Sequence, residues 1–520
     1  MMYDYEKNKE EHPEPIKAEI KGSLPGWLQG TLIRNGPGLF SLGDTSYNHW
    51  FDGLALLHSF TFKDGEVTYR SRYLRGDTYN SNMQAGRIVV SEMGTMAFPD
   101  PRKNIFNKVI TFLNHTIPDF TDNCGNNIVR YGKDYYATSE TNYIRKIDPF
   151  TLETKEKVDY QKYHALNLVT SHPHYDKEGN SYNLGTSIAE KGKTKYTLFK
   201  VPSPEECSEL PVALKKLEVI CSVSCRSLLT PSYYHSFGMT ENYFIFIEQP
   251  LKLDILKMAT AYLRGVSWAS CLKFQPEENT LIHVIDRKTQ KEVATKFYTN
   301  AMVVYHHVNA FEEDGHLVFD VVAYNDNSLY DMFFLETLKQ QKESGNSSTY
   351  CRPKYKRFAL PLTDKGGETG EDLVKLKYTT ASAVKEKDGK IHCQPEVLCE
   401  GVELPRINYD FNGQKHRYAY MTGVEMSSVA TKIMKFDVET KKQTEWRGEN
   451  CWPSEPVFIP TPDGVEEDDG VILTSVINSN PGESDFLLVL DAKSFTEIAR
   501  AYVKAELHMD MHGYFIPHCK

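Results

Sequence analysis

The residues of this chain best suited to joint chemistry are four widely separated histidines: His172, His235, His306 and His512. The first three share a local pattern, a strand-like stretch that runs into a polar turn and then a second strand-like stretch. The fourth stands near the end of the sequence, in HMDMHGYF. Imidazole is a good ligand for iron, zinc, copper or nickel. A fold that gathers these side chains would therefore create a metal site.

Neighbouring histidines compete for the same role. His306 and His307 are adjacent, and the alternation of a strand sends them to opposite faces, so at most one of them can point at a shared centre. His172 and His174 fall on the same face of a regular strand, but Pro173 between them makes regularity doubtful. From the residues alone, the choice within each pair stays open.

A metal-bound imidazole usually has its second ring nitrogen held by a carboxylate or a carbonyl. Three glutamates lie in strand-end settings where they could do this: Glu140, Glu403 and Glu455. A glutamate at a strand end is more often a solvated surface residue, so both interpretations stand at this point. The acidic run 466–469 is more typical of a turn before a strand than of a metal site.

Strand and turn signals dominate the sequence. FKDGEVTYRSRYL, GRIVVSEMGTMAF, EDGHLVFDVVAY and KDGKIHCQPEVL place β-branched or aromatic residues beside turn residues, and Asp-Gly between such runs favours a hairpin. The first three histidines are 63 and 71 residues apart, and the fourth follows 206 residues later. Propeller blades take roughly 40–50 residues. We therefore expect an all-β chain, a closed propeller that forms a single domain over 1–520.

Composition excludes several classes of function. A net charge of −10 without a basic stripe argues against nucleic acid as a partner. No apolar run approaches the ~18 residues that a transmembrane helix needs. The charged start of the chain resembles neither a signal peptide nor a mitochondrial presequence, and the 10 cysteines contain no CxxC. We expect a cytosolic protein with reduced thiols.

Two stretches, 103–114 and 251–272, are predicted to be helices with exposed apolar faces. The alternatives are packing against the body of the fold or reversible contact with a membrane or lipid-droplet surface. The residues predicted to form this entrance surface are Phe106, Ile110, Phe112, Leu113, Ile255, Met258 and Tyr262.

The chain resembles the carotenoid cleavage oxygenase family from end to end. The resemblance rests on ordered motifs: RNGPG (34–38), NHWFDGLALLHSF (48–60), FPDP (98–101), TDNCGNN (121–127), SETNYI (139–144), SHPHYD (171–176), PSYYHSFG (231–238), HHVNAFEEDG (306–315), PSEPVF (453–458) and HGYF (512–515). So many motifs in order are highly specific.

The resemblance implies a seven-bladed β-propeller covered by a dome of helices and loops. It implies Fe²⁺ on the propeller axis, held by the first His of HHVNA and by the three other histidines named at the outset. Glu140, Glu403 and Glu455 would each orient one of His235, His306 and His512, which leaves His172 without a carboxylate. Tyr233 and Tyr324 would be candidates to stabilise a polyene cation, or would simply pack in their strands.

Within the family the chain is most similar to the central-cleaving animal members. That similarity implies an iron dioxygenase that inserts O₂ across the 15,15′ double bond of β-carotene and related provitamin A carotenoids to give retinal, a step of vitamin A formation. The alternatives are eccentric 9′,10′ cleavage, a retinoid isomerohydrolase on the same scaffold and a non-catalytic carotenoid-binding propeller. Relatives often have cysteine in PDPCKNIF; Arg102 in this chain excludes a lipid anchor at that position.

Overall fold

The computed structural model describes residues 3–97, 120–188, 193–206, 212–344, 352–363, 367–424 and 430–518. Strands account for most of the regular structure in these ranges, and they form seven sheets of four or more strands together with two two-stranded ribbons, β4–β5 (Ser41–Leu42, Thr45–Ser46) and β19–β20 (Leu251–Leu253, Leu272–Phe274).

The larger sheets follow one another along the chain. The sheet that joins the two ends of the chain contains β1 (Ile16–Lys17), β7 (Glu66–Tyr73), β6 (Leu54–Lys63), β3 (Gly30–Leu39) and β39 (His512–Pro517). The next two contain β8 (Asn127–Tyr131), β9 (Asp134–Thr138), β10 (Tyr143–Ile147) and β11 (Thr154–Asp159), and then β12 (Leu168–Val169), β13 (His174–Tyr175), β14 (Ser181–Ser187), β15 (Lys195–Val201) and β16 (Glu218–Ser224).

The middle of the chain builds two more sheets. One contains β17 (Gly238–Met239), β18 (Tyr243–Glu248), β21 (Thr280–Asp286), β22 (Lys291–Glu292), β23 (Phe297–Thr299), β27 (Ser382–Lys385) and β28 (Ile391–Gln394). The other contains β24 (Val303–Glu313), β25 (His316–Tyr324), β26 (Lys354–Pro361) and β29 (Glu396–Glu400).

The last two sheets complete the set. One contains β30 (Val402–Arg406), β31 (Tyr418–Gly423), β32 (Lys432–Asp437) and β33 (Gln443–Trp446). The other contains β34 (Cys451–Pro453), β35 (Val457–Pro460), β36 (Gly470–Asn478), β37 (Phe486–Asp491), β38 (Glu497–Tyr502) and the early strand β2 (Glu19–Gly22).

These sheets form a closed ring, so the expected all-β propeller is confirmed. β17 contacts β24, β24 contacts β30, β32 contacts β34, and β39 contacts β8. The two ends of the chain close the ring, because β39 pairs antiparallel with β3 and β2 pairs with β38. Closure removes the outermost sheet edges that would otherwise attract other chains.

Asp-Gly turns join the hairpins as the sequence predicts. β6 and β7 are connected through Asp64 and Gly65, and β24 and β25 through Asp314 and Gly315. All four residues have positive φ, between 48° and 76°. That conformation is the one a tight two-residue hairpin turn requires.

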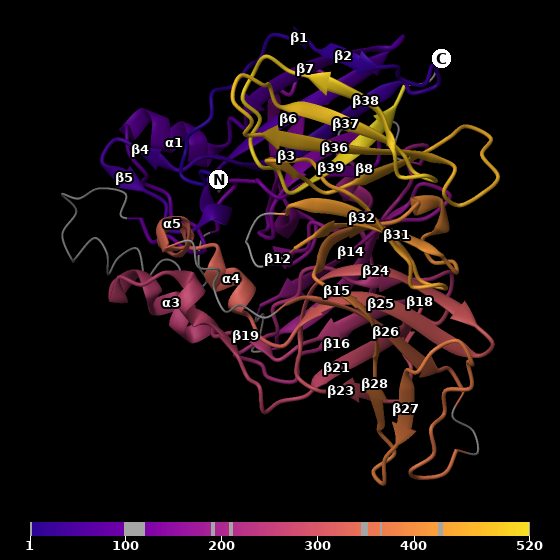
Figure 1. The fold of residues 1–520 in the computed structure, drawn as a ribbon. Coiled ribbons are helices and arrows are strands. Elements are labelled where there is room, and N and C mark those ends of the chain that lie inside the picture. Colours follow the sequence, from indigo (N-terminus) through magenta and orange to yellow (C-terminus); the bar gives the residue numbers. More distant parts are fainter. Residues whose placement is uncertain are drawn as a thin grey trace.

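The helices gather on one side of the ring (Figure 1). In the described ranges they are α1 (Asp77–Ala85), α3 (Ile255–Arg264), α4 (Ser328–Met332) and α5 (Leu335–Ser344). The same ranges contain five short 3-10 turns: η1 (Trp50–Asp52), η2 (Tyr160–Lys162), η3 (Ala213–Lys216), η4 (Trp268–Cys271) and η5 (Tyr409–Phe411). None of the helices in the described ranges is long and apolar enough to cross a membrane.

Two sequence predictions were wrong in this helical region. GRIVVSEMGTMAF, predicted as strands, forms no regular strand over 86–97; it contains one isolated bridge, between Glu92 and Thr95. The helix expected at 251–272 is restricted to Ile255–Arg264, because β19 precedes it and η4 and β20 follow it. The helix expected at 103–114 lies outside the described residues, as does Arg102.

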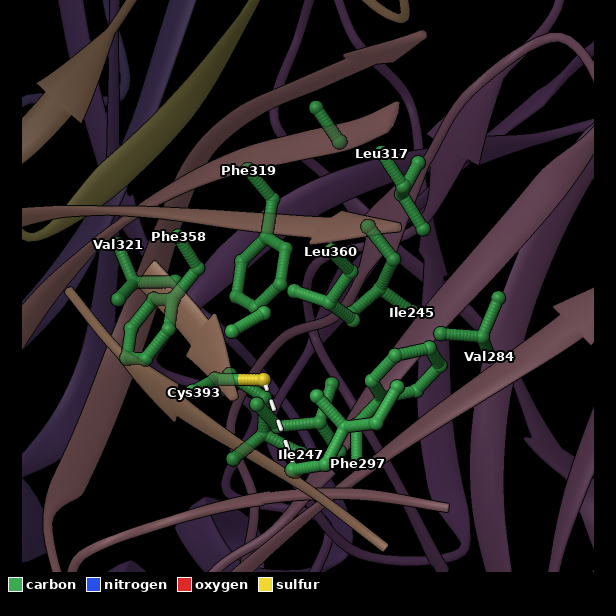
Figure 2. Packing of buried hydrophobic residues seen from close by; sticks show 14 of the residues in the cluster. Ile245, Ile247, Val284, Phe297, Leu317, Phe319, Val321, Phe358, Leu360 and Cys393 are labelled. Atoms are coloured by element: carbon green, nitrogen blue, oxygen red, sulfur yellow. Dashed lines mark hydrogen bonds between the residues drawn. The ribbon is translucent and has the colours of Figure 1, made fainter. Parts of the chain in front are cut away.

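Apolar side chains fill the spaces between neighbouring sheets. Figure 2 shows one such cluster, in which Ile245, Val284, Phe319, Phe358 and Leu360 come from the two sheets built on β17 and β24. The rings of Phe319 and Phe358 stack at 5.0 Å. Burying each such side chain contributes about 1.5–3 kcal/mol, and these contacts fix the angle at which the sheets meet.

Candidate metal centre and its cavity

The four histidines come together at one point. One ligand atom from each ring lies within 4.8 Å of the others: His172, His235, His306 and His512. Donors on opposite sides of a metal ion bound at about 2.1 Å are about 4.2 Å apart, so the arrangement is close to that of a ligand set. The structure thus unites all four residues that the sequence singled out.

Each histidine stands at the inner end of a sheet. His172 lies in the loop between β12 and β13, and His235 precedes β17. His306 lies in β24 where the register with β25 shifts, between Val304 and His307. Such a bulge places an extra residue in one strand and redirects its side chain.

His512 occupies the first position of β39, opposite Asn35 of β3. The pairing that closes the ring therefore also places the fourth histidine. A residue so near the end of the chain reaches the centre because its strand is held by the N-terminal part of the sequence.

Three glutamates each hold the outer nitrogen of one histidine. The Nδ1 atom of His235 faces Glu140, that of His306 lies 2.7 Å from Glu403, and that of His512 lies 2.6 Å from Glu455. An N–H at Nδ1 leaves the Nε2 lone pair free to bind a metal. Within the described residues the Nε2 atoms of His306 and His512 are buried and have no hydrogen-bond partner.

Further groups, which sequence reasoning did not find in this role, hold the glutamates. The Tyr233 hydroxyl donates to Glu140 at 2.8 Å, and the Tyr324 hydroxyl donates to Glu403 at 2.8 Å. The third carboxylate is held differently, since Arg406 donates from Nε to Glu455 at 3.0 Å. The only sequence signal for Arg406 was its place three residues after Glu403.

Charges around the centre keep two of these carboxyl groups ionised. Burial acts to raise the pKa of Glu455, but Arg406 and His512 hold it at about 2. Burial acts to raise the pKa of Glu403 as well, and His306 outweighs it, so this pKa is lowered. Two negative charges therefore stand behind the imidazoles, where they would offset the charge of a bound cation.

His172 differs from the other three ligand candidates. Its backbone N–H donates to Thr170 Oγ1 at 3.0 Å, and its Nε2 lies 3.1 Å from that of His235. Burial and the neighbouring imidazoles lower the pKa of His172 well below its ordinary value. A neutral ring is the form that binds metal.

His174 and His307, the alternatives to His172 and His306 as metal ligands, have different surroundings. His174 donates from Nε2 to Phe237 O at 2.8 Å, and its Nδ1 accepts from the Tyr409 hydroxyl at 3.0 Å. His307 is outside the cluster, and burial lowers its pKa to about 3. The acidic run at 466–469 forms a turn before β36 in which Lys493 pairs with Asp469, as expected of a turn.

The centre lies between two cavities, one largely apolar and one of mixed polarity. An apolar cavity of about 360 Å³ on the helical side reaches His235, His306 and His512, and its wall includes Trp268 and Phe333. A second cavity of about 860 Å³, whose wall is mixed polar and apolar and includes Arg130 and Arg406, reaches His172. An apolar ligand would approach the metal site through the first cavity.

The residues predicted for an entrance surface occupy different places. Ile255 and Met258 are 8% and 3% exposed, and Met258 lines the apolar cavity. Tyr262 is half-buried. The prediction that Ile255 and Met258 form an exposed face was wrong, because helical periodicity selects the face that packs on the body of the fold. Phe106, Ile110, Phe112 and Leu113 lie outside the described residues.

The donor set fits a metal ion with a preference for nitrogen. Four imidazoles converge, two of their Nε2 atoms lack any other partner in the described structure, and carboxylates fix the tautomer of three rings. An all-imidazole set of this kind suits first-row transition metals rather than calcium or magnesium.

Comparison with known proteins agrees with this site. The family model described as "Retinal pigment epithelial membrane protein" matches residues 5–517. This chain belongs to that family, the carotenoid oxygenases. The match includes all four histidines and all three glutamates of the centre.

Two relatives of this carotenoid oxygenase share more than half of its residues. The beta,beta-carotene 15,15′-dioxygenase of Gallus gallus is 64% identical over 515 residues, 99% of this chain and 98% of the relative. The enzyme of the same name from Homo sapiens is 61% identical over 513 residues, 98% and 94% of the two chains. The mitochondrial carotenoid-cleaving dioxygenase of Mustela putorius furo is 44% identical over 519 residues, 98% and 95%.

The fold of the carotenoid oxygenase also has solved counterparts. The crystal structure of a cobalt-substituted Synechocystis apocarotenoid oxygenase superposes with a TM-score of 0.77, covering 99% of this chain and 98% of the other at 23% identity. At that identity the likeness supports the propeller fold alone.

Proposed function

We propose that this carotenoid oxygenase is an iron-dependent dioxygenase that cleaves the central 15,15′ double bond of β-carotene with O₂ and yields retinal. The observation that carries the proposal is the position of the four-histidine centre at an apolar cavity. The central position of the cut is supported by the relatives at 64% and 61% identity, whose names state that activity.

The protein's own residues would prepare the centre for catalysis. His172, His235, His306 and His512 would hold Fe²⁺, which when bound supplies the site at which O₂ is activated. Glu140, Glu403 and Glu455 keep a proton on Nδ1 of three rings, so that each Nε2 stays available. Because the carboxylates are themselves held by Tyr233, Tyr324 and Arg406, the rings cannot turn away without breaking further hydrogen bonds.

The cavity would bind the polyene by burial alone. β-Carotene is a hydrocarbon, so its affinity comes from apolar area removed from water, at about 25 cal/mol per Å². The shape of the cavity then decides which double bond reaches the centre. Tyr233 and Tyr324 line the cavity, and we retain their rings as candidates to stabilise positive charge on the polyene.

We also propose transient contact of the helical side with a membrane or lipid-droplet surface. Support comes from exposed leucines on and beside α3: Leu228, Leu229, Leu256 and Leu263. The backbone N–H of Ile255 donates to Leu229 O at 3.1 Å, which places the loop against the start of α3. Lys257 and Arg264 on the same helix would favour an anionic surface.

Three expectations from the sequence remain proposals. We propose a single carotenoid oxygenase domain over 1–520, which the family match over 5–517 supports. We propose seven blades, and support for this count comes from the seven sheets of four or more strands. A cytosolic location is proposed on the sequence argument alone.

A product assay tests the function. Iron-loaded protein is incubated with β-carotene in air and, as a control, under argon, and the products are separated by chromatography. Retinal as the sole product, formed in air only, is the expected result. An apo-10′-carotenal would instead indicate eccentric cleavage, and no O₂-dependent cleavage would indicate an isomerohydrolase or a binding protein.

A further inference from the structure

The two cavities at the metal centre share part of their walls. His306 and His512 line both of them, whereas His235 lines only the apolar cavity and His172 lines only the second one. The set of four ligand candidates can therefore be reached from either cavity. The apolar cavity suits a hydrocarbon, and the second cavity has no role in the proposed reaction.

The second cavity begins at the protein surface. Five residues of its wall are exposed to solvent: Lys177, Glu178, Glu241, Asp410 and Gln414. At the other end His172 is partly exposed, although His235 and His512 are buried. Because His172 lines only this cavity, its exposed surface is directed into it. The second cavity therefore leads from solvent to the ligand set.

The apolar cavity is a poor route for a metal ion. A divalent cation that leaves water for an apolar environment loses much of its hydration energy. Two carboxyl groups in that wall offset little of this loss, since burial raises the pKa of Asp52 to about 7 and the pKa of Glu92 well above its usual value. Burial thus disfavours the charged forms that would attract a cation.

The wall of the second cavity can be wetted. Its exposed rim carries three carboxylates, Glu178, Glu241 and Asp410, against one lysine, Lys177. A polar space of this size can hold water. A hydrated ion therefore keeps its water shell until it reaches the imidazoles.

Three arginines also lie in this wall, and each is engaged by acceptors of the protein. Arg130 and Arg287 donate to backbone carbonyls at 2.7 Å and 2.6 Å. Arg406 forms an ion pair with Glu455, which also lines the cavity. These contacts hold the guanidinium groups against the wall.

His172, at the inner end of the cavity, is the ligand candidate whose ring is least held. Nδ1 of each of the other three rings faces a glutamate, but Nδ1 of His172 has no hydrogen-bond partner within the described residues. His172 also lies in a loop, between β12 and β13. Its ring can therefore turn toward an incoming ion with less rearrangement than the other three.

We propose that the metal ion enters and leaves the centre through the second cavity, while the polyene uses the apolar cavity. This inference rests on the metal centre of the proposed function. A hydrated cation takes the wetted route, and a hydrocarbon takes the apolar one. The metal can then be exchanged while substrate occupies the apolar cavity.

Release of metal from the loaded protein tests the route without any cleavage. The protein is loaded with Co²⁺, and release to an excess of chelator is followed by visible absorbance. Asp410→Trp/Gln414→Trp places two large rings at the rim of the second cavity. Glu156→Trp/Gln161→Trp replaces the same residue types at exposed positions outside both cavity walls and is the matched control.

We expect the tryptophan pair at the rim to slow Co²⁺ release several-fold and the control pair to leave the rate unchanged. An obstacle in a path slows entry and exit alike, so the affinity for Co²⁺, measured by competition with the chelator, should stay that of the wild type. A distorted ligand set would instead weaken the affinity and speed release. The direction of the rate change therefore separates a blocked route from a damaged site.

A second variant tests the route by charge, in case the tryptophan pair disturbs folding. Glu241→Lys places a positive charge at the rim, which should oppose the passage of a cation and slow release several-fold at low ionic strength. The effect should shrink in high salt, which screens exposed charges. Glu156→Lys, outside both cavity walls, is the control.

Wild-type release rates in both Asp410→Trp/Gln414→Trp and Glu241→Lys would overturn the proposal, because the metal would then leave by another path. Equal slowing in the control variants would overturn it as well. Failure of the proposed function is a separate result, because it appears as missing retinal in the product assay, whereas this test follows only the metal. A wild-type protein that retains no Co²⁺ would overturn both proposals.

Discussion

At the scale of single residues, the centre depends on how each carboxylate is held. Glu403 accepts from His306, from the Tyr324 hydroxyl and from the backbone N–H of Leu404 at 2.5 Å. Leu404 has a φ of 48°, an uncommon value for a branched residue. Backbone strain of this kind persists where surrounding contacts demand it, and here it directs an N–H at the carboxylate.

Replacing Glu403 with Gln should weaken metal binding by about 10–100-fold. The amide keeps the shape of the side chain but removes the charge that holds the proton on His306 Nδ1. Metal affinity is measured by competition with a chelator, with Glu400→Gln, an exposed glutamate in the same region, as the matched control. Unchanged affinity in Glu403→Gln would show that His306 needs no anionic partner.

At the scale of elements, strand β39 has two roles, and removing the strand would eliminate both at once. It carries His512, and it also pairs with β3 to close the ring. Removing residues 511–520 should therefore abolish metal binding and lower the thermal-unfolding midpoint together.

His512→Ala separates the two effects, because it removes the ligand and keeps the strand. We expect metal binding to be lost while the unfolding midpoint of the metal-free protein falls far less than in the truncated chain. The midpoints are compared by circular dichroism, and the metal content by elemental analysis. One equivalent of metal retained in His512→Ala would contradict the ligand assignment.

One apolar face of helix α3 packs against the protein, and a few other apolar residues of the helix are exposed. Leu256→Asp and Leu263→Asp change exposed positions, so they should reduce co-sedimentation with anionic lipid vesicles while leaving the fold intact. Activity on vesicle-embedded β-carotene should fall several-fold more than activity on detergent-dispersed substrate. Equal loss with both substrates would count against a membrane role, and Thr260→Asp on the same helix controls for added charge.

At the scale of the whole molecule, a buried ion pair between neighbouring strands makes stability depend on pH. Asp320 of β25 is fully buried and accepts two hydrogen bonds from Arg357 of β26, at 2.8 Å and 2.9 Å. Burial opposes ionisation, but Arg357 and His416 hold the pKa of Asp320 well below its usual range.

A carboxyl group whose pKa is lower in the folded than in the unfolded state stabilises the protein above its unfolded pKa, about 3.9. That contribution is lost as the pH falls below this value. Asp320→Asn should therefore be less stable than the wild type at pH 7, and the gap should narrow between pH 5 and pH 3. Thermal-unfolding midpoints measure this, with the exposed Asp388→Asn as control. A gap that stays constant with pH would exclude the mechanism.

The sequence by itself determined many of the hairpins and the residues that could do chemistry. Asp-Gly between strand-like runs specified the hairpins locally, because two-residue turns depend on the φ angles of those two residues. The four histidines and three glutamates were assigned to one site through the resemblance to the carotenoid cleavage oxygenase family, which rests on short motifs such as HHVNA.

Features that depend on contacts between residues far apart in the sequence could be decided only by the tertiary structure. The periodicity of α3 could not tell a face that packs on the protein from one that meets solvent, because both are apolar. The stretch 86–97 has the composition of strands, but it forms no regular strand and lines the cavity with Glu92. Arg406, Tyr233 and Tyr324 hold the carboxylates only because the ring closes and brings separate sheets to one axis, and no local pattern encodes such a meeting.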